Sequence, residues 1–208
     1  MTVRKTNSSR TTRVWQRMLS GRRLDLIDPS PMDVEIEDIA HGLARVARWN
    51  GQTTGAHAFS VAQHSVLVVE ICETLHPALK ADQKLMALLH DSPEYVIGDM
   101  ISPFKAILGD SYKGIEQRLE EAVHLRFGLP ARTPQKLKKV IKQADRICAW
   151  FEAVQLAGFE VKEADRFFGK PPEKIKLDLE PKPAEDAQAS FMAKHVSLLA
   201  AMEAERRS

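Results

Sequence analysis

The stretch 85–105 carries side chains whose types and spacing suit metal binding and acid–base chemistry. It begins as an apolar run of good helix formers, and it then places His90 beside Asp91, with Glu94 shortly after them. Because Pro93 lacks a backbone N–H, a regular helix is expected to kink or end near it. A neutral imidazole beside a carboxylate is a natural pair of ligands for a divalent metal ion. The stretch therefore predicts a metal-binding pair at a helix break.

Two more ligand-type side chains lie on the core-facing sides of other predicted helices. His64 lies on the apolar stripe of a helix over about 59–75, and Asp145 lies beside the stripe of a helix over about 134–157. Buried imidazole and carboxylate groups are costly unless they are paired or bind a metal. Taken alone, His64 is better explained as a hydrogen-bonded core residue, and Asp145 as a carboxylate with a backbone N–H or the adjacent Arg146 as its partner. Together the predicted ligands of one divalent ion are His64, His90, Asp91 and Asp145.

The elements that must position these residues are helical. Apolar residues recur with the helical period, convincing strands are absent, and the sequence predicts an all-α fold with about six main helices. The predicted helices cover about 33–48, 59–75, 80–92, 112–127, 134–157 and 185–205. Asp33 is the expected N-cap of the first of these helices. The region 158–184 is rich in Pro, Lys and acidic residues and is expected to be an irregular loop, within a single domain over 1–208.

Composition excludes several broad classes of function. The net charge is +2 and 44% of residues are apolar, so the chain as a whole is not an obvious nucleic-acid binder. No stretch approaches the length of a membrane span. The two cysteines, Cys72 and Cys148, fall in apolar helical patterns, which favours core positions in a reducing compartment such as the cytoplasm. Residues 1–25 form a basic segment that reads as a partly ordered tail, a phosphate-attracting arm or a transit peptide.

The order His64, His90-Asp91, Asp145 resembles the H…HD…D signature of the HD-domain metal-dependent phosphohydrolases. Members of that family are all-helical and hydrolyse phosphomonoesters, phosphodiesters or triphosphates of nucleotides. The resemblance implies that two histidines and two aspartates surround one divalent ion. It also implies that the chain forms a helical bundle of the HD-domain type.

A closer resemblance, over about 35–150, is to the bacterial HD-domain 5′-deoxynucleotidases, which remove phosphate from deoxyribonucleoside monophosphates. In that group the HD pair is followed by Glu, Gly-Asp, Pro and Lys, and an Arg-Trp pair precedes the first ligand histidine. The matching residues here are Glu94, Gly98-Asp99, Pro103, Lys105 and Arg48-Trp49. The resemblance implies a catalytic role for Glu94 and Asp99. It implies substrate binding by Arg48, Trp49 and Lys105.

Other branches of the family match less well. Alarmone hydrolases carry Glu-Asp after the HD pair, whereas Tyr95 follows Glu94 here. The Gly-Tyr-Pro element of the cyclic-di-GMP phosphodiesterases does not follow, and the chain is short for a dNTP triphosphohydrolase. These departures favour the nucleotidase branch.

The residue types suggest a division of labour in such a site. Two carboxylates nearly neutralise a divalent ion, which still polarises a P–O bond and acidifies water. Mixed nitrogen and oxygen ligands suit Mn, Co, Fe, Ni or Zn better than Mg. Glu94 either takes a proton from the attacking water or is a surface or capping carboxylate. Arg48 either holds phosphate through two hydrogen bonds, which Lys cannot form, or is a residue at a helix C-terminus that the helix dipole favours. Trp49 either packs on the nucleotide or belongs to the core, and Lys105 either screens phosphate or is solvated.

The expected function is a divalent-metal-dependent phosphohydrolase that removes the 5′-phosphate from (deoxy)nucleoside monophosphates. Two alternatives stay open: an HD phosphohydrolase that acts on a cyclic, diphosphate or triphosphate nucleotide, and a catalytically silent module that binds nucleotide. The expected cofactor is one divalent ion. The expected partners are a nucleotide and a second copy of the chain in a homodimer, without a membrane or a specific nucleic acid.

Overall fold

The computed structural model describes residues 13–101, 107 and 110–207. Within these ranges it contains eight α-helices and one small two-stranded sheet, which confirms the predicted all-α class. Lys105, the predicted phosphate-screening residue, and Pro103 of the family match lie outside the described residues.

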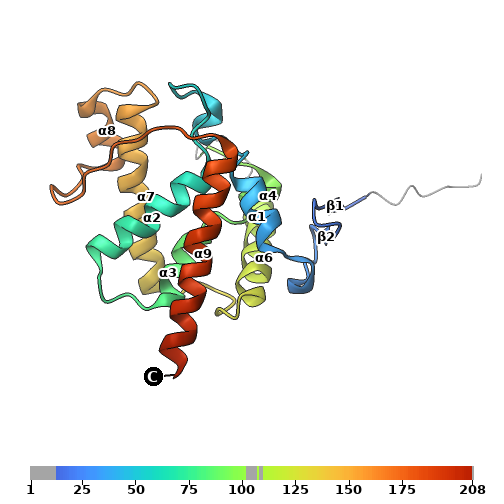
Figure 1. Ribbon diagram of the computed structural model, residues 1–208. Helices are drawn as coiled ribbons and strands as arrows, with labels where there is room; N and C mark the ends of the chain where they lie inside the picture. Colours follow the sequence, from blue (N-terminus) through green and yellow to red (C-terminus); the bar gives the residue numbers. More distant parts are fainter. Residues whose placement is uncertain (1–12, 102–106, 108–109, 208) are drawn as a thin grey trace, which may run out of the picture.

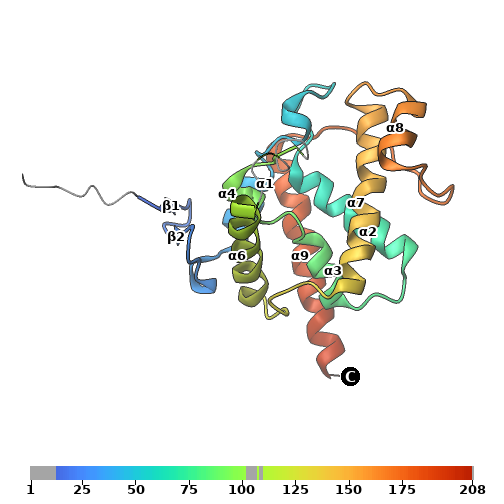
Figure 2. The ribbon, with the colours of Figure 1, turned by 180° about the vertical axis from the view of Figure 1, so that it is seen from behind.

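The long C-terminal helix α9 crosses the front of the bundle, and the other helices lie behind it and to its sides (Figure 1). It packs against α1, α2 and α3, while α7 packs against α2 and carries α8 (Figure 2). One buried apolar cluster joins side chains from Leu24 near the N-terminus to Met202 in α9. The helices are α1 Ile36–Leu43, α2 Val61–Leu75, α3 Ala81–Leu88, α4 Glu94–Ile97, α6 Asp110–Arg126, α7 Gln135–Gln155, α8 Val161–Phe168 and α9 Ala184–Arg207.

The first helix is shorter at both ends than the predicted range 33–48. The hydroxyl of Ser30 accepts a hydrogen bond from Met32 N and caps a separate 3-10 turn, so Asp33 lies in that turn and the N-cap prediction was wrong. After Leu43 the chain leaves the helix, because Ala47 is extended and pairs with Ser60 in an isolated bridge. This pairing between distant residues sets the path of the chain toward Arg48.

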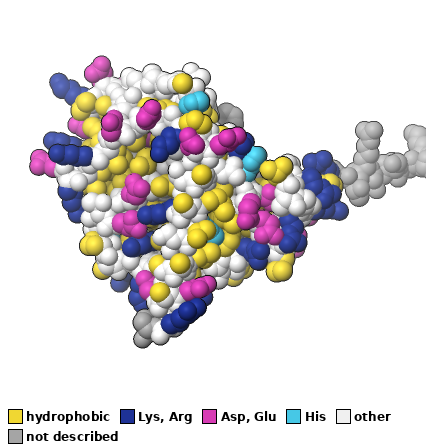
Figure 3. All heavy atoms as spheres, viewed as in Figure 1, with side chains coloured by type: hydrophobic (Ala, Val, Ile, Leu, Met, Phe, Trp, Pro, Cys, Tyr) yellow, Lys and Arg dark blue, Asp and Glu magenta, His cyan; other side chains and the backbone are white. Residues whose placement is uncertain are grey.

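The basic N-terminal segment contains the small sheet, which the sequence pattern did not predict. Strands β1 (Trp15–Arg17) and β2 (Arg23–Asp25) pair antiparallel, and Asp38 of α1 accepts hydrogen bonds from the backbone and hydroxyl of Ser20 between them. Three guanidinium groups lie over the ring of Trp15 at 4.4–5.4 Å from its centroid. Figure 3 shows Lys and Arg side chains gathered on this hairpin at the right of the view.

The region 158–184, expected to be an irregular loop, contains α8 near its start. Ala164 is buried against α7, and the indole N–H of Trp150 in α7 donates to Asp165 at 2.8 Å, so contacts with α7 hold this short helix in place. Cys72 and Cys148 are buried and free, as core positions require. In the part of the chain that the structure describes, no helix is both long and apolar enough to span a membrane.

Candidate active site

The break between α3 and α4 delivers the His-Asp pair to one side of the bundle. Helix α3 ends at Leu88, the chain turns through His90 and Asp91, and α4 begins at Glu94 directly after Pro93. The predicted break near Pro93 is therefore present, although the helix ends sooner than the expected residue 92. His90 and Asp91 lie in the turn rather than on a regular helix.

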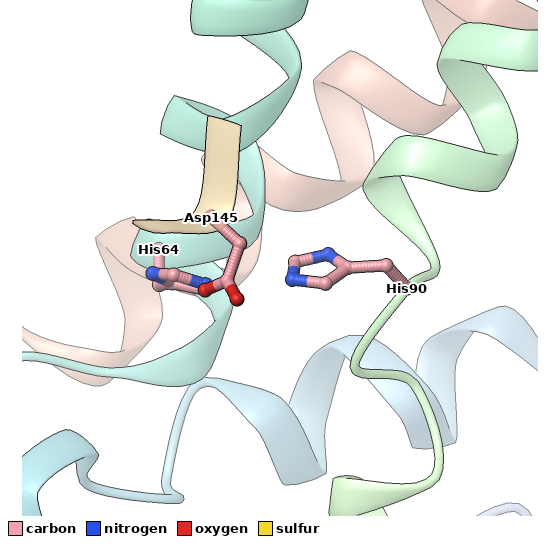
Figure 4. Close-up of side chains that lie close together, drawn as sticks. All are labelled: His64, His90 and Asp145. Atoms are coloured by element: carbon pink, nitrogen blue, oxygen red, sulfur yellow. The ribbon is translucent and has the colours of Figure 1, made fainter. Parts of the chain in front are cut away.

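All four predicted ligand side chains converge. His64 Nε2 lies 3.3 Å from an Asp145 oxygen and 3.6 Å from an Asp91 oxygen, and His90 Nε2 lies 3.2 Å from the same Asp91 oxygen. Figure 4 shows the carboxylate of Asp145 between the two imidazole rings, whose centroids are 5.4 Å apart. Ligand atoms of His64, His90 and Asp145 all lie within 4.8 Å of one another. One ion can therefore be reached by groups from α2, the α3–α4 turn and α7.

Hydrogen bonds on the far side of each ring fix which nitrogen faces this centre. His90 Nδ1 lies 2.9 Å from the carbonyl oxygen of Ala87, which can only accept, so Nδ1 carries the proton. His64 Nδ1 lies 2.6 Å from a carboxylate oxygen of Glu152 and donates in the same way. In both neutral rings Nε2 then keeps its lone pair, and neither buried Nε2 has a hydrogen-bond partner among the described residues. Two such nitrogens beside two carboxylates fit a divalent cation.

The charge state of the centre also suits a cation. Burial raises the pKa of the Asp91 and Asp145 carboxyl groups, but the neighbouring histidines lower it further, so both groups stay ionised. Burial lowers the pKa of His64, yet the Glu152 carboxylate raises it above the ordinary value. A cation near Nε2 would take the place of the proton that His64 otherwise attracts.

Glu152 is a residue of this site that sequence reasoning missed. Its side chain is fully buried, and besides His64 it accepts hydrogen bonds from Trp49 Nε1 at 2.8 Å, Arg48 Nε at 3.2 Å and Cys148 Sγ at 3.3 Å. The signal was present in the sequence. Glu152 follows Asp145 by seven residues, which is about two helical turns and therefore the same side of α7.

His64, Cys148 and Glu152 form a second group of ligand-type side chains, and all three are buried. Burial raises the pKa of the Cys148 thiol to about 12, so the sulfur keeps its proton and donates it to Glu152. The carboxyl group of Glu152 has a lowered pKa despite its burial, because Arg48 and His64 lie beside it. This group is a hydrogen-bonded cluster behind the candidate metal centre rather than a second set of ligands.

A cleft with a volume of about 910 Å³ opens over this centre. Arg48, Trp49, Asp91, Glu94, Asp99 and Asp145, all predicted from the sequence, line it. Lining residues that the sequence did not point to include Lys142 and Arg146 on α7, next to Asp145, and Phe159, Phe167 and Phe168 around α8. The cleft is therefore lined by acidic residues of the candidate metal centre, by two cations of α7 and by aromatic rings, and its volume suits a nucleotide-sized ligand.

The Arg-Trp pair enters the cleft through an unusual turn. Trp49 and Asn50 have left-handed backbone angles, with φ of 57° and 51°. Such angles are uncommon for a bulky side chain and persist only where surrounding contacts impose them. Trp49 makes edge contacts with Phe159 and Phe168 at 5.5 and 6.0 Å between centroids, in addition to its bond with Glu152. The loop thus depends on residues more than a hundred positions away.

The remaining predicted site residues also lie in this region. Glu94 is buried with 2% of its surface exposed, in the first turn of α4, and it lines the cleft. Asp99 lies 3.6 Å from Arg48 Nη1. Apart from Lys105, every predicted site residue therefore lines the cleft or contacts a residue that does.

Comparison with known proteins shows the family to which the chain belongs. The family model described as 5′-deoxynucleotidase YfbR-like matches residues 39–198. This range covers nearly all of the stretch over about 35–150 in which the sequence resembles the deoxynucleotidases, and it continues through α8 and most of α9. The chain is also 58% identical over 189 residues to an uncharacterized protein of Rhodobacter capsulatus, an alignment that covers 90% of this chain and 96% of that protein. The chain belongs to the YfbR-like 5′-deoxynucleotidase family of the HD-domain superfamily.

Proposed function

We propose that the protein is a divalent-metal-dependent phosphohydrolase that removes the 5′-phosphate from deoxynucleoside monophosphates. The observation that carries this proposal is the convergence of two imidazole Nε2 atoms and two carboxylates beneath a cleft that Arg48 and Trp49 also line. Membership of an HD-domain family, whose members use a divalent metal, supports it.

We propose His64, His90, Asp91 and Asp145 as the ligands of one ion. When bound there, a divalent cation supplies Lewis-acid polarisation of the phosphate and lowers the pKa of water. Nitrogen and oxygen donors in equal number suit Mn, Co, Fe, Ni or Zn, with Mg less favoured. The Nδ1 hydrogen bonds to Ala87 O and Glu152 hold both rings in the orientation that such a ligand set needs.

We assign the general base to Glu94. Its carboxylate lines the same cleft as Asp91 and Asp145, four residues after the proposed ligand His90, so it can accept a proton from water held there. The oxygen of water bonds to phosphorus while the bond from phosphorus to the 5′-oxygen breaks. One water proton passes to Glu94 and the other stays with the phosphate. The leaving 5′-oxygen takes up a proton from solvent, to which Glu94 later releases its own, and the products are phosphate and the deoxynucleoside.

Arg48 is the proposed phosphate-binding residue. Glu152 engages its Nε, and Asp99 lies 3.6 Å from its Nη1, so the guanidinium is held from two sides. A guanidinium fixed in this way can present N–H groups to phosphate oxygens without first losing side-chain freedom. Asp99, expected to be catalytic, is therefore proposed to orient Arg48. Trp49 is proposed to close the cleft against the 2′ side of the sugar.

A phosphate-release screen of the purified protein tests the proposal. Mono-, di-, tri- and cyclic nucleotides are each incubated with Mn²⁺, Co²⁺, Ni²⁺, Zn²⁺ and Mg²⁺, and released phosphate is measured. We expect 5′-monophosphates of deoxynucleosides to be the best substrates, with little discrimination between bases. Release from cyclic or triphosphate nucleotides alone, or from none of them, would contradict the proposal. A homodimer and a cytoplasmic location stay predictions, and light scattering on the same sample measures the first.

A further inference from the structure

The carboxylate of Glu152 connects the candidate metal centre to the Arg48–Trp49 turn. One oxygen, Oε1, accepts from His64 Nδ1 at 2.6 Å and from Cys148 Sγ at 3.3 Å. The other oxygen, Oε2, accepts from Trp49 Nε1 at 2.8 Å and from Arg48 Nε at 3.2 Å. Since all four partners donate, only an ionised carboxylate can satisfy them.

At the candidate metal centre, the hydrogen bond with Glu152 determines which nitrogen of His64 can bind a metal ion. Because Nδ1 donates to Oε1, the lone pair stays on Nε2, which faces Asp145 and Asp91. A glutamine at position 152 offers one accepting oxygen and one donating amide. It cannot accept from both sides, and an amide N–H next to Nδ1 would favour the other His64 tautomer, with the proton on Nε2.

On the nucleotide side, Glu152 holds the Arg48–Trp49 turn. Trp49 is in the left-handed region with φ 57°, an unfavourable backbone state that its surroundings must impose. The bond from its indole N–H to Oε2 and the edge contacts with two phenylalanines are the contacts that do so. The same oxygen also accepts from Arg48, so it sets the direction of both side chains.

We propose that Glu152 is a positioning residue that couples the metal centre to nucleotide recognition, so that metal affinity and selectivity for the deoxy sugar depend on one buried carboxylate. The inference rests on the proposed function for its selectivity part. It goes beyond that function because it makes both properties depend on the same residue, Glu152.

The test compares Glu152→Gln with the matched control Glu160→Gln, the same chemical change at an exposed position outside the cleft. Titration of metal-free protein with Mn²⁺ by calorimetry should show affinity about 10- to 100-fold lower in Glu152→Gln, the range typical for loss of a partner behind a metal ligand. The ratio of kcat/KM for dAMP to that for AMP should fall to the value of a Trp49→Ala variant. Glu160→Gln should match wild type in both.

A spectroscopic measurement separates positioning from general damage. The indole N–H resonance of Trp49, assigned from its loss in Trp49→Phe, should shift in metal-free Glu152→Gln and stay in place in Glu160→Gln. Trp49→Phe removes one donor to Oε2 and leaves the His64 bond to Oε1 in place, so it should lower sugar selectivity while Mn²⁺ affinity stays at the wild-type value. The double variant Glu152→Gln/Trp49→Phe should lose no more selectivity for the deoxy sugar than either single variant, because both substitutions break the same hydrogen bond.

Several results would overturn the coupling. Unchanged Mn²⁺ affinity in a folded Glu152→Gln protein would show that Glu152 does not support metal binding. An unchanged ratio of kcat/KM for dAMP to that for AMP would show that it does not support sugar selectivity. If Glu152→Gln does not fold, Glu152→Asp keeps the charge but is one methylene shorter, and it should show the same two losses. If wild type turns over neither nucleotide, the proposed function fails, while dAMP and AMP dissociation constants and the Mn²⁺ and resonance measurements still decide the coupling.

Discussion

Arg48 and Asp99 form an ion pair, with 3.6 Å between Nη1 and the carboxylate, and only 14% and 8% of their side-chain surfaces are exposed. A pair this buried is costly unless each charge has further partners, and Glu152 supplies one for Arg48. The arrangement leaves Arg48 fixed beside the cleft before any ligand arrives. A fixed fork of donors is what recognition of a phosphate dianion needs.

Replacing Arg48 with lysine should therefore weaken substrate binding more than it slows chemistry. Lys cannot form two parallel hydrogen bonds, and loss of a charge-assisted bond costs roughly 1.5–3 kcal/mol, or about 10- to 150-fold in KM for dAMP. Steady-state kinetics of Arg48→Lys measure this. The control is Arg45→Lys, an exposed arginine three residues away that bonds to Gln188 instead. A KM within about twofold of wild type would exclude Arg48 as the phosphate ligand.

His90→Ala should lose metal and activity together. Its Nδ1 donates to Ala87 O, and its buried Nε2, which has no hydrogen-bond partner among the described residues, keeps a lone pair that can bind a cation. Metal content by mass spectrometry and phosphate release are measured on the same preparation. Wild type should also unfold at a higher temperature with Mn²⁺ than with EDTA, by the equivalent of about 2.7 kcal/mol at a hundred times the Kd.

The matched control is His57→Ala, an exposed histidine that does not line the cleft. It should keep wild-type metal content and turnover. Metal-dependent turnover retained in His90→Ala would argue against the ligand set.

Glu94→Gln should separate catalysis from metal binding. The substitution removes the proton acceptor but keeps the shape of the side chain, so metal content should match wild type while kcat falls by roughly 10²- to 10⁴-fold. The comparison uses single-turnover phosphate release from dAMP by metal-loaded protein. Wild-type turnover in a variant that carries full metal would mean that another group takes the proton.

The site residues that could be predicted from the sequence are those that a short stretch of sequence identifies by itself. The His90-Asp91 pair at a proline break, and His64 on an apolar stripe, can be recognised from spacing alone, because a helix repeats every few residues. Glu152 could have been found in the same way, two turns after Asp145, as an acid on the core-facing side of α7. It was overlooked because its partners come from distant segments.

The features that could not be predicted depend on contacts between distant segments. The end of α1 follows from the pairing of Ala47 with Ser60 across a loop. Helix α8 is short, and its surroundings are rich in Pro and Lys, so its helical state depends on packing against α7. The left-handed turn at Trp49 depends on contacts from residues beyond 150. None of these contacts can be recognised from the sequence of the segment itself.

His195 should make the fold less stable in mild acid. It is buried in α9 against the ring of Phe127, at 5.0 Å, and neither ring nitrogen has a hydrogen-bond partner among the described residues. Burial lowers the pKa of His195 below its ordinary value of 6.5, with Glu37 opposing the shift. The unfolded chain then binds the proton more readily than the folded one. Stability is therefore complete above pH 6.5 and is lost as the pH falls toward the folded-state pKa.

Urea unfolding at pH 7 and pH 5 tests this expectation. Each pH unit between the two pKa values is worth about 1.4 kcal/mol, and His195→Leu should reduce the loss of stability between pH 7 and pH 5. His57→Leu, at an exposed position, should leave that loss unchanged. An equal loss in wild type and His195→Leu would assign the pH dependence to other groups.

Trp49 should set the preference for deoxynucleotides. Its indole N–H is bound to Glu152 and its edges meet Phe159 and Phe168, so the ring is fixed where it lines the cleft. A ring fixed against the 2′ carbon of the sugar leaves little room for the 2′-hydroxyl of a ribonucleotide and offers it no hydrogen-bond partner. Burying an unpaired hydroxyl costs roughly 1–3 kcal/mol, which is about 5- to 150-fold in kcat/KM for dAMP over AMP.

Trp49→Ala should bring the dAMP/AMP ratio close to one, mainly by improving the use of AMP rather than by impairing that of dAMP. The control is Trp15→Ala, because that ring lies in the N-terminal hairpin under three arginines and does not line the cleft. A wild-type ratio near one, or a high ratio that survives the Trp49 substitution, would remove Trp49 from sugar recognition. The metal centre and Glu94 would then support a phosphohydrolase whose selectivity is set by another wall of the cleft, with Phe159 and Phe168 the next residues to change.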